Sequence, residues 1–324
     1  MKRNNIYLKF IDETLKVIRE TRLPLYSSKY SKQTYDQHQL MVMVLFKEYM
    51  GADYRSFTQR MELMYPILDI LELEDVPHFT TLQKFVSRIS TYKFNRILNQ
   101  TVKLFYNRGD SPGIVAVDAS GMTSCYASYY YSLRTDSYRK NFLKTSISVD
   151  TDKLIILADK ITKNPVHDIK HAVPVLKQSH SIKKPLYYVM DKGYDSERIH
   201  ELIRDELGSY AVIPIRNRSR KKINGKYRKE MYIDFSEVIY FERNLVETVI
   251  SVIKRLFGEE VKARKYRNQV KEVKTKLILY NIHRSIVNYD ILIIIKVFYR
   301  ANYRKGFLQS QIFTTGIYSL THNI

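Results

Sequence analysis

The chain contains 324 residues, enough for two domains, one of them with a full-sized hydrophobic core. Its 54 Lys and Arg residues outnumber its 33 Asp and Glu residues, so the formal net charge is +21. The repulsion between these excess positive charges favours a polyanionic partner. Nucleic acid is the first hypothesis and an acidic membrane surface is the second. The 27 tyrosines can stack on bases or sugars, although composition alone explains them equally well.

The cysteine count and the apolar runs exclude several protein classes. Cys125 is the single cysteine, which excludes an intrachain disulfide and a cysteine-based zinc site and fits a reducing, intracellular compartment. The polar segment MKRNNIYLKFIDETLK at the start shows no signal peptide. The apolar run ILIIIKVF is far shorter than the roughly 20 residues that span a bilayer. We therefore do not expect a membrane protein.

Residues 1–107 are expected to form an all-α domain. The segment QHQLMVMVLFKEYM has helical apolar spacing, and a second short helix is expected over 54–64. A third helix is expected within HFTTLQKFVSRI, where Thr80 and Gln83 fit a capping box. Three short helices with exposed Arg and Lys residues resemble a helix-turn-helix module, with a plain helical bundle as the alternative.

After the linker expected at YNRGDSPG, the pattern changes to that of an α/β domain over 113–290. Short apolar runs predict strands at GIVAVDASG, KTSISVD, KLIILADKIT, PLYYVMDKGYDS and SYAVIPIR. Helices are expected at HDIKHAVPVLKQ and SERIHELIRDEL, the second with Asp195 or Ser196 as its N-cap. Three strands followed by helix, strand, helix, strand and helix is the order of a ribonuclease-H-like domain. Residues 291–324 are expected to form a C-terminal helix and tail.

The segment YFERNLVETVISVIKRLFGEE is expected to form one long amphipathic helix. Tyr240, Arg243, Glu247 and Lys254 stand at offsets of 0, 3, 7 and 14, which places them within about 60° of one another on the helix. The apolar residues of the segment fall on the opposite face. A carboxylate between cations suits a site that binds divalent metal and phosphate together, whereas a solvated surface is the ordinary alternative.

Two aspartates are expected at the ends of predicted strands, Asp118 after the first and Asp191 after the fourth. Parallel neighbouring strands would bring these carboxylates to one edge of the sheet, and Glu247 lies on the helix that could pack beside that edge. Taken singly, each Asp is more commonly a turn or cap residue. Two Asp and one Glu supply hard oxygen ligands for Mg²⁺ or Mn²⁺, and a pair of such ions serves phosphodiester chemistry.

These motifs together resemble the DDE transposases of bacterial and archaeal insertion sequences, in the group marked by a Y-(2)-R-(3)-E-(6)-K signature. That spacing is matched at every position, by Tyr240, Arg243, Glu247 and Lys254. The segments VAVDAS and VMDKGYDS resemble the two Asp segments of the family. VPHFTTLQKFVSRI resembles the segment ahead of the catalytic domain in many members. The resemblance covers roughly residues 35–285 and implies a ribonuclease-H-like catalytic domain preceded by an all-α, helix-turn-helix-like domain that binds the ends of the element.

The resemblance also implies roles for individual residues. The catalytic residues that hold two Mg²⁺ or Mn²⁺ ions would be Asp118, Asp191 and Glu247. The residues that contact the DNA backbone near the transposon end would be Tyr240, Arg243 and Lys254. His167 and Asp168 stand where relatives often show a His-Asp pair, although a helix N-cap explains Asp168 equally well.

The activity implied by the resemblance is metal-dependent strand cleavage at the element ends, followed by strand transfer into target DNA. The partners would be the terminal inverted repeats, the target DNA and a second copy of the chain in a homodimer. The location would be the prokaryotic cytoplasm, in association with the nucleoid. Two alternatives stay open: a ribonuclease-H-like nuclease that cuts without joining, and a catalytically silent DNA-binding protein derived from a transposase.

The segment 216–229 contains eight Lys or Arg residues in 14 positions and no acid. We interpret it as a contact with the DNA backbone, with an inert loop as the alternative. The DNA-binding residues expected from it are Arg216, Arg218, Arg220, Lys221 and Lys222.

Overall fold

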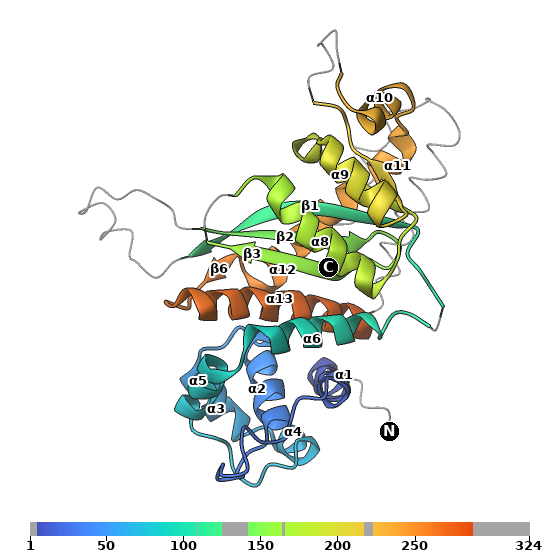
Figure 1. The fold of residues 1–324 in the computed structure, drawn as a ribbon. Helices are drawn as coiled ribbons and strands as arrows, with labels where there is room; N and C mark the ends of the chain where they lie inside the picture. Colours follow the sequence, from blue (N-terminus) through green and yellow to red (C-terminus); the bar gives the residue numbers. More distant parts are fainter. Residues whose placement is uncertain (1–4, 108, 125–141, 164–165, 217–222, 288–324) are drawn as a thin grey trace, which may run out of the picture. The chain divides into compact units, whose positions relative to one another are not determined.

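The computed structural model describes residues 5–107, 109–124, 142–163, 166–216 and 223–287. Contacts between Cα atoms gather the chain up to Ile286 into one compact unit (Figure 1). Within the described residues, no helix is both long enough and apolar enough to cross a membrane.

The first part of the chain is helical, as predicted. Its helices are α1 (Ile6–Glu20), α2 (Gln37–Tyr49), α3 (Tyr54–Met61), α4 (Tyr65–Ile70), α5 (Phe79–Arg88) and α6 (Thr91–Val102). Phe46 joins three of them, because its ring centroid lies 6.0 Å from that of Phe10 and 6.0 Å from that of Phe57. All three rings are fully buried, so this cluster is the core of the helical part.

The capping box of the helical part lies at α2. Asp36 accepts a hydrogen bond from the Gln39 backbone N–H at 2.6 Å, and the Gln39 side chain accepts one from the Asp36 N–H at 2.9 Å. The capping box predicted at Thr80 is wrong. The helix α5 begins one residue earlier, at Phe79, so Thr80 already lies inside it, and the Thr80 hydroxyl bonds to the His78 ring at 2.8 Å.

The second part of the chain forms a mixed sheet that contains the five predicted strands. Its strands are β1 (Ile114–Ser124), β2 (Phe142–Asp150), β3 (Ile155–Thr162), β4 (Tyr187–Met190) and β5 (Tyr210–Val212), in the spatial order β3-β2-β1-β4-β5. The first three strands pair in antiparallel fashion, whereas β4 pairs parallel to β1 and β5 parallel to β4. This α/β arrangement is consistent with the ribonuclease-H-like fold expected from the order of the elements. A further short strand, β6 (Glu260–Val261), pairs with the end of β1 and was not predicted.

The sequence predicted that the strand β1 ends at Asp118, and this prediction is wrong. The strand continues to Ser124 because β2 goes on pairing with it, from Asp118 opposite Ile147 to Thr123 opposite Phe142. Asp118 instead marks the level at which β4 ends. The last pair between β1 and β4 joins Val117 to Met190.

Helices cover the sheet and connect it to the helical part. The helix α8 (Asp168–Ile182) packs on β2 and β3, and α12 (Asn244–Phe257) packs on β1 and β2. Figure 1 shows α8 across the front of the sheet, with α13 (Tyr266–Ile286) and α6 side by side beneath it.

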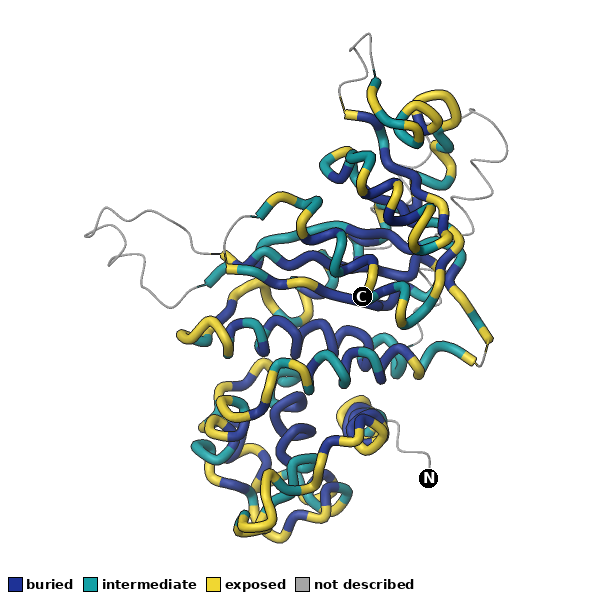
Figure 2. Tube along the Cα trace, in the orientation of Figure 1, coloured by how far each residue is buried: buried dark blue, intermediate teal, exposed yellow. Residues whose placement is uncertain are grey.

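The helix α13 belongs to both parts of the chain. It contacts β3 on one side and α6, α1 and α2 on the other, and Figure 2 shows most of its length as buried. The Asn281 side chain accepts a hydrogen bond from the Ile156 N–H at 2.9 Å and donates one to the Thr101 hydroxyl at 2.9 Å. The Lys274 ammonium pairs with the buried Asp159 carboxylate at 2.5 Å. These contacts hold the helices and the sheet together.

Candidate active site

The register of β1 and β4 sets the positions of the two predicted aspartates. Because Val117 pairs with Met190, the next residue of each chain segment, Asp118 and Asp191, follows at the same level of the sheet. The electrostatic consequence appears in the pKa of Asp118, which the charge of Asp191 helps to raise. The structure therefore brings the two carboxylates together.

The continuous helix predicted from Tyr240 onward is wrong, because the chain forms two helices. The short helix α11 (Glu237–Phe241) ends before α12 begins at Asn244. At the junction, the Arg243 N–H bonds to the Tyr240 carbonyl at 3.0 Å and the Val246 N–H bonds to the Arg243 carbonyl at 3.1 Å. These three-residue steps are tighter than those of an α-helix, so Tyr240 and Glu247 do not share one regular stripe.

Arg243 stands between two of the predicted carboxylates. Its Nη1 donates a hydrogen bond to Glu247 Oε1 at 2.7 Å and lies 3.6 Å from Asp118 Oδ2. Burial by itself lowers the pKa of Arg243, but the hydrogen bond to Glu247 and the neighbouring acidic groups raise it overall. Arg243 is therefore a permanent cation at the centre of the site, and its side chain is 17% exposed.

The groups around Asp118 act on the pKa of its carboxylate in both directions. Burial raises its pKa, the Ala119 N–H at 2.7 Å and the Arg243 charge lower it, and the charges of Glu247 and Asp191 raise it again. The net result is a pKa above the ordinary value. Two neighbouring carboxylates thus act on Asp118, and a divalent cation would relieve this repulsion.

The donor set fits a hard divalent cation in its chemistry, because Asp118, Asp191 and Glu247 offer carboxylate oxygens. The Arg243 guanidinium, however, lies between the Asp118 and Glu247 carboxylates. Over the described residues, no three Asp, Glu, His or Cys side chains are grouped as metal ligands. Glu247, whose side chain is 53% exposed, would have to release its Oε1 oxygen from Arg243 in order to ligate a metal ion with that oxygen.

Tyr240 faces the second aspartate. Its hydroxyl donates to Asp191 Oδ1 at 3.5 Å, which is the long limit of a hydrogen bond, and its ring lies 5.8 Å from the Arg243 guanidinium carbon. Burial raises the pKa of Tyr240, Arg243 lowers it and Asp191 raises it, with a net increase. The phenol therefore stays protonated and can act as a hydrogen-bond donor.

A fourth carboxylate, Asp168, borders the same site. A Cβ atom added at Gly193 would lie 3.3 Å from Asp168 Oδ2, which is a tight contact, and 3.9 Å from Asp191 Oδ2, which is ordinary van der Waals contact. Asp168 is the first residue of α8 and pairs with the Lys144 ammonium, whereas His167 occupies the N-cap position, so the alternative of Asp168 as a helix N-cap is wrong. Of the predicted His-Asp pair, Asp168 thus lies close to the site.

Comparison with known proteins agrees with this geometry. The sequence profile of a family described as "Transposase DDE domain" matches residues 109–282, which is more than half of the chain. The chain belongs to this family. A search of curated proteins gives no match. At the level of the family, the chain is a transposase, which implies DNA as its partner, and the family generally uses divalent metal ions.

Within the DDE domain, Lys254 lies apart from the carboxylates. Its ammonium pairs with Glu259 Oε2 at 3.1 Å. Seven residues of helix separate it from Glu247, or about 10 Å along the axis. The structure therefore brings Tyr240, Arg243 and Glu247 to the two aspartates and leaves Lys254 near the far end of α12.

The second Asp of VMDKGYDS has a structural role in the DDE domain. The side chain of Asp195 is fully buried and accepts two hydrogen bonds from the Arg228 guanidinium, both at 2.7 Å, and one from the Arg216 N–H at 2.8 Å. The neighbouring Ser196 occupies the N-cap position of α9 (Glu197–Glu201). Asp195 thus holds α10 (Lys226–Ile233) against α9, which is not the capping role that the sequence offered it.

The basic segment is only partly described. Arg216 is exposed, and its backbone N–H is the group that bonds to Asp195. The other residues predicted there lie outside the described residues; they are Arg218, Arg220, Lys221 and Lys222. Three site residues were missed by sequence reasoning: Lys144, Gly193 and Tyr194. Tyr194 is buried, and its pKa is raised by burial and then by Asp118, Asp168 and Asp191.

Proposed function

We propose that this DDE transposase is the transposase of an insertion sequence in the Y-(2)-R-(3)-E-(6)-K group. It cuts a DNA strand at each end of the element and joins the freed 3′-hydroxyl group to target DNA. The observation that carries the proposal is the Arg243 guanidinium, which lies between Asp118 and Glu247 beside Asp191. This arrangement combines carboxylate ligands with a phosphate-binding cation in one place.

The metal ligands in this proposal are Asp118, Asp191 and Glu247, holding two Mg²⁺ or Mn²⁺ ions. When bound, the metal supplies an activated nucleophile and stabilises the leaving oxygen. The partial burial of Asp118 limits access of water to its carboxylate, so that its charge is less screened and acts more strongly on a bound cation. Asp168 borders Asp191 across Gly193 and adds to the negative charge of the pocket.

The DNA-binding groups in the proposal are the Tyr240 phenol and the Arg243 guanidinium. Arg243 Nε is buried and has no hydrogen-bond partner in the described part of the chain, so this donor of the guanidinium is left unsatisfied. Tyr240 can donate its hydroxyl proton to a phosphate oxygen instead of the long contact with Asp191. Lys254, farther along α12, would bind the backbone of the same DNA.

The wider organisation is part of the same proposal. Residues 1–107 would recognise the terminal inverted repeats, and residues 113–290 would carry out the chemistry. Residues 291–324, which lie outside the described residues, would form a C-terminal helix and tail. Two copies of the chain would hold two element ends together. The protein would act in the prokaryotic cytoplasm, at the nucleoid.

The experiment uses the full chain and a labelled duplex that carries the DNA flanking the gene. With Mg²⁺, the wild-type protein should cut this duplex, whereas Asp118→Asn, Asp191→Asn and Glu247→Gln should bind it nearly as well without cutting. Glu237→Gln, an exposed change on α11, is the matched control and should cut normally. Full Mg²⁺-dependent cleavage by any of the three site variants would refute the assignment.

A second substrate separates the proposal from its alternatives. A pre-nicked end with a free 3′-hydroxyl group, mixed with circular target DNA, should give joined products. Cleavage without joining would identify a ribonuclease-H-like nuclease, and binding without either reaction would identify a silent DNA-binding protein.

A further inference from the structure

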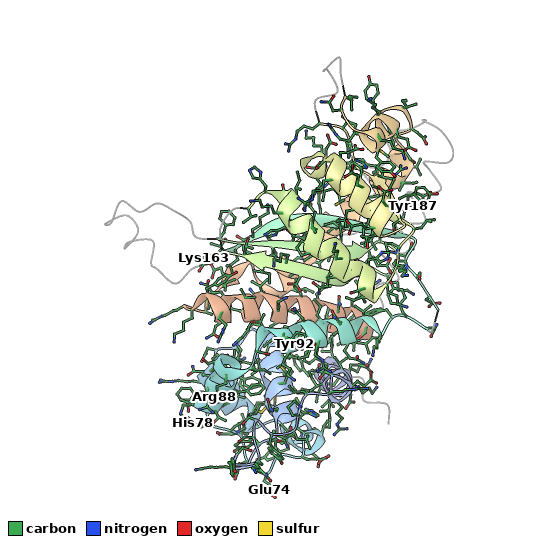
Figure 3. The ribbon with its side chains drawn as sticks, viewed as in Figure 1. Glu74, His78, Arg88, Tyr92, Lys163 and Tyr187 are labelled. Atoms are coloured by element: carbon green, nitrogen blue, oxygen red, sulfur yellow. The ribbon has the colours of Figure 1, made fainter. Side chains whose placement is uncertain are left out.

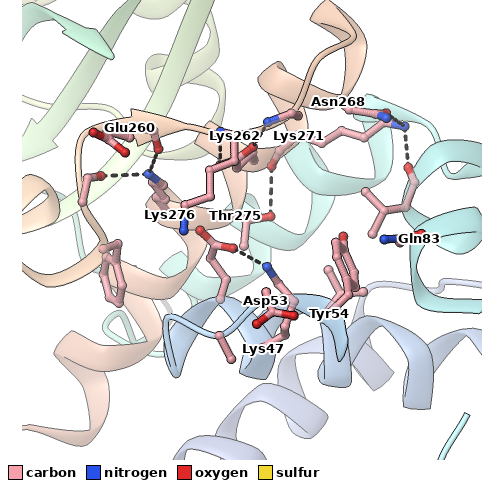
Figure 4. Close-up of a pocket in the computed structure, with 18 of the residues that line it drawn as sticks. Lys47, Asp53, Tyr54, Gln83, Glu260, Lys262, Asn268, Lys271, Thr275 and Lys276 are labelled. Atoms are coloured by element: carbon pink, nitrogen blue, oxygen red, sulfur yellow. Dashed lines mark hydrogen bonds and ion pairs between the residues drawn. The ribbon is translucent and has the colours of Figure 1, made fainter. Parts of the chain in front are cut away.

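A large cleft lies away from the carboxylates, where the helical part meets the segment that follows α12. Its volume is ≈ 840 Å³, and among the described residues that line it Asp118, Asp191 and Glu247 do not occur. One wall comes from α2, α3 and α5, and the other from residues 256–276 (Figure 4). The two walls belong to different parts of the sequence but to one compact unit.

Several charged groups in the cleft are already used inside the protein. Lys271 donates to the carbonyls of Val86 at 2.6 Å and Ser87 at 3.1 Å, at the end of α5. Lys276 donates to the carbonyls of Gly258 at 2.8 Å and Glu260 at 2.6 Å, just after α12. These two buried ammonium groups satisfy backbone oxygens at helix ends, so they are not available to a ligand.

The acidic residues of the cleft are also largely used. Glu272 accepts hydrogen bonds from the backbone N–H groups of Lys262 and Ala263, both at 2.9 Å. Asp53 caps α3, and Glu48 pairs with Lys47 at 2.9 Å. Together, Glu272 and Lys276 attach the segment 258–263 to α13 and fix its conformation.

Three cations, one on this segment and two directly after it, face solvent. Lys262, Arg264 and Lys265 are exposed, and their side chains make no hydrogen bond or ion pair with any described residue. Among the described lining residues, Glu260 is the acid without such a side-chain bond, so the free charges of the wall are mainly positive. The positive end of the α13 dipole adds to this, since α13 begins at Tyr266.

We propose that this cleft binds the phosphate backbone of the DNA duplex whose strand enters the carboxylate site, with the cationic segment 262–265 as the phosphate-binding element. The inference rests on the proposed function and adds a second DNA contact to it. A segment whose backbone is held in place and whose cations are free suits phosphate binding, because little backbone entropy is lost when the anion binds.

The spacing between the two sites fits one duplex. The helix α12 runs from the carboxylate site at Glu247 to the cleft at Phe257, a rise of about 15 Å for ten residues. That length corresponds to roughly four base pairs, because successive phosphates of one strand lie about 3.4 Å apart along the duplex axis. Lys254 lies between the two sites on the same helix.

The opposite wall can contact the same duplex. Gln83 and Ser87 stand one turn apart on the exposed side of α5 and line the cleft. Figure 3 marks the two ends of this helix with His78 and Arg88. Amide and hydroxyl groups at these positions can bond to phosphate oxygens or base edges.

The test compares two triple variants of the full chain. The first removes the free cations of the cleft, by Lys262→Ala, Arg264→Ala and Lys265→Ala. The second is the matched control and removes three exposed lysines at β3, α8 and the residues after α8, by Lys160→Ala, Lys170→Ala and Lys184→Ala. Both variants lose the same net charge, so a difference between them reports the place of the charge.

Binding is measured by fluorescence anisotropy on a labelled duplex that carries the DNA flanking the gene, over a series of salt concentrations. The cleft variant should bind at least about tenfold more weakly, and the slope of log affinity against log salt should fall by about 2.7, or 0.9 for each of three phosphate contacts. The control should retain most of the wild-type slope. Equal slopes for the two variants would overturn the proposal.

A footprint on the wild-type protein provides evidence that does not depend on the variants. Acetylation of lysines, read by mass spectrometry, should be suppressed by the duplex at Lys262 and Lys265 but not at Lys170 and Lys184. If the protein binds and cuts the duplex but Lys262 and Lys265 are not protected, the proposal for the cleft is rejected and the proposed function stands. A wild-type protein that neither binds nor cuts the duplex would instead reject the proposed function.

Discussion

Arg243 and Glu247 lie one turn apart at the start of α12, and the guanidinium donates to the carboxylate at 2.7 Å. The same guanidinium lies 3.6 Å from Asp118. Glu247 therefore cannot bind a metal ion with the oxygen that Arg243 holds. In our proposal, a DNA phosphate that draws Arg243 away would release this carboxylate, so that DNA binding and metal binding support each other.

Removal of Arg243 should strengthen metal binding while weakening catalysis. We expect Arg243→Ala to bind Mn²⁺ a few-fold more tightly in the absence of DNA, because the competing ion pair is worth about 1 kcal/mol at a partly exposed site. Strand cleavage should nevertheless fall, since the phosphate-binding cation is lost. Calorimetric titration gives the affinity, with Arg255→Ala, an exposed change on the same helix, as the control. Unchanged or weaker Mn²⁺ binding by Arg243→Ala would argue against competition.

The pKa of Asp118 gives a prediction that needs no DNA. Burial raises this pKa, and the charges of Glu247 and Asp191 raise it further, against the lowering by Ala119 and Arg243. Between the ordinary and the raised value, the folded state keeps a proton that the unfolded state releases, so the free energy of unfolding decreases as the pH rises through that window. Asp118→Asn has no ionisable group at this position, so its free energy of unfolding does not decrease in this window. It should therefore melt at a higher temperature than the wild type in metal-free buffer at neutral pH.

The measurement is a thermal melt at several pH values, with and without Mn²⁺. The advantage of Asp118→Asn should shrink towards acidic pH, where the wild-type carboxyl is protonated. Added Mn²⁺ should stabilise the wild type more than the variant. Asp69→Asn, an exposed change on α4, serves as the control. A variant that is less stable than the wild type at neutral pH without metal would contradict the assigned charge repulsion.

Loss of the Arg228 guanidinium should destabilise the segment before the active site. Arg228→Ala leaves the buried Asp195 carboxylate with the Arg216 N–H at 2.8 Å as its remaining partner, and should cost about 3 kcal/mol. Arg228→Lys should not restore the loss, because an ammonium cannot donate both bonds in the geometry of the guanidinium fork. Hydrogen exchange should accelerate over α10, whereas the exposed Lys229→Ala should leave it unchanged. Full rescue by lysine would refute the role of the paired bonds.

The sheet and the meeting of the two aspartates could be predicted because they follow from local patterns. Apolar runs bounded by polar turns predicted β1 to β5, and parallel pairing of β1 with β4 brings Asp118 and Asp191 to one level. The two-residue strand β6 is too short to give such a pattern. The capping box of α2 was visible in the sequence, since Asp36 and Gln39 have the spacing that was assigned instead to Thr80 and Gln83.

The junction between α11 and α12 could not be predicted, because it contains neither glycine nor proline. The residues Glu242 and Arg243 keep right-handed helical angles, and the tightening consists of hydrogen bonds that each span three residues. The ion pair of Asp168 could not be predicted, because its partner Lys144 lies 24 residues earlier in the chain. Contacts of this kind depend on how β2 and α8 pack, and no local pattern indicates them.

The position of α13 restricts how the chain can be divided. The side of this helix that does not face β3 is covered by α6, α1 and α2, and Leu277, Ile278 and Ile282 are almost completely shielded from water. A fragment cut at the sequence YNRGDSPG would lose that cover and expose an apolar helix surface. Separate expression of the catalytic half should therefore give aggregates, and mixing experiments with isolated halves would report on misfolded material rather than on transposition.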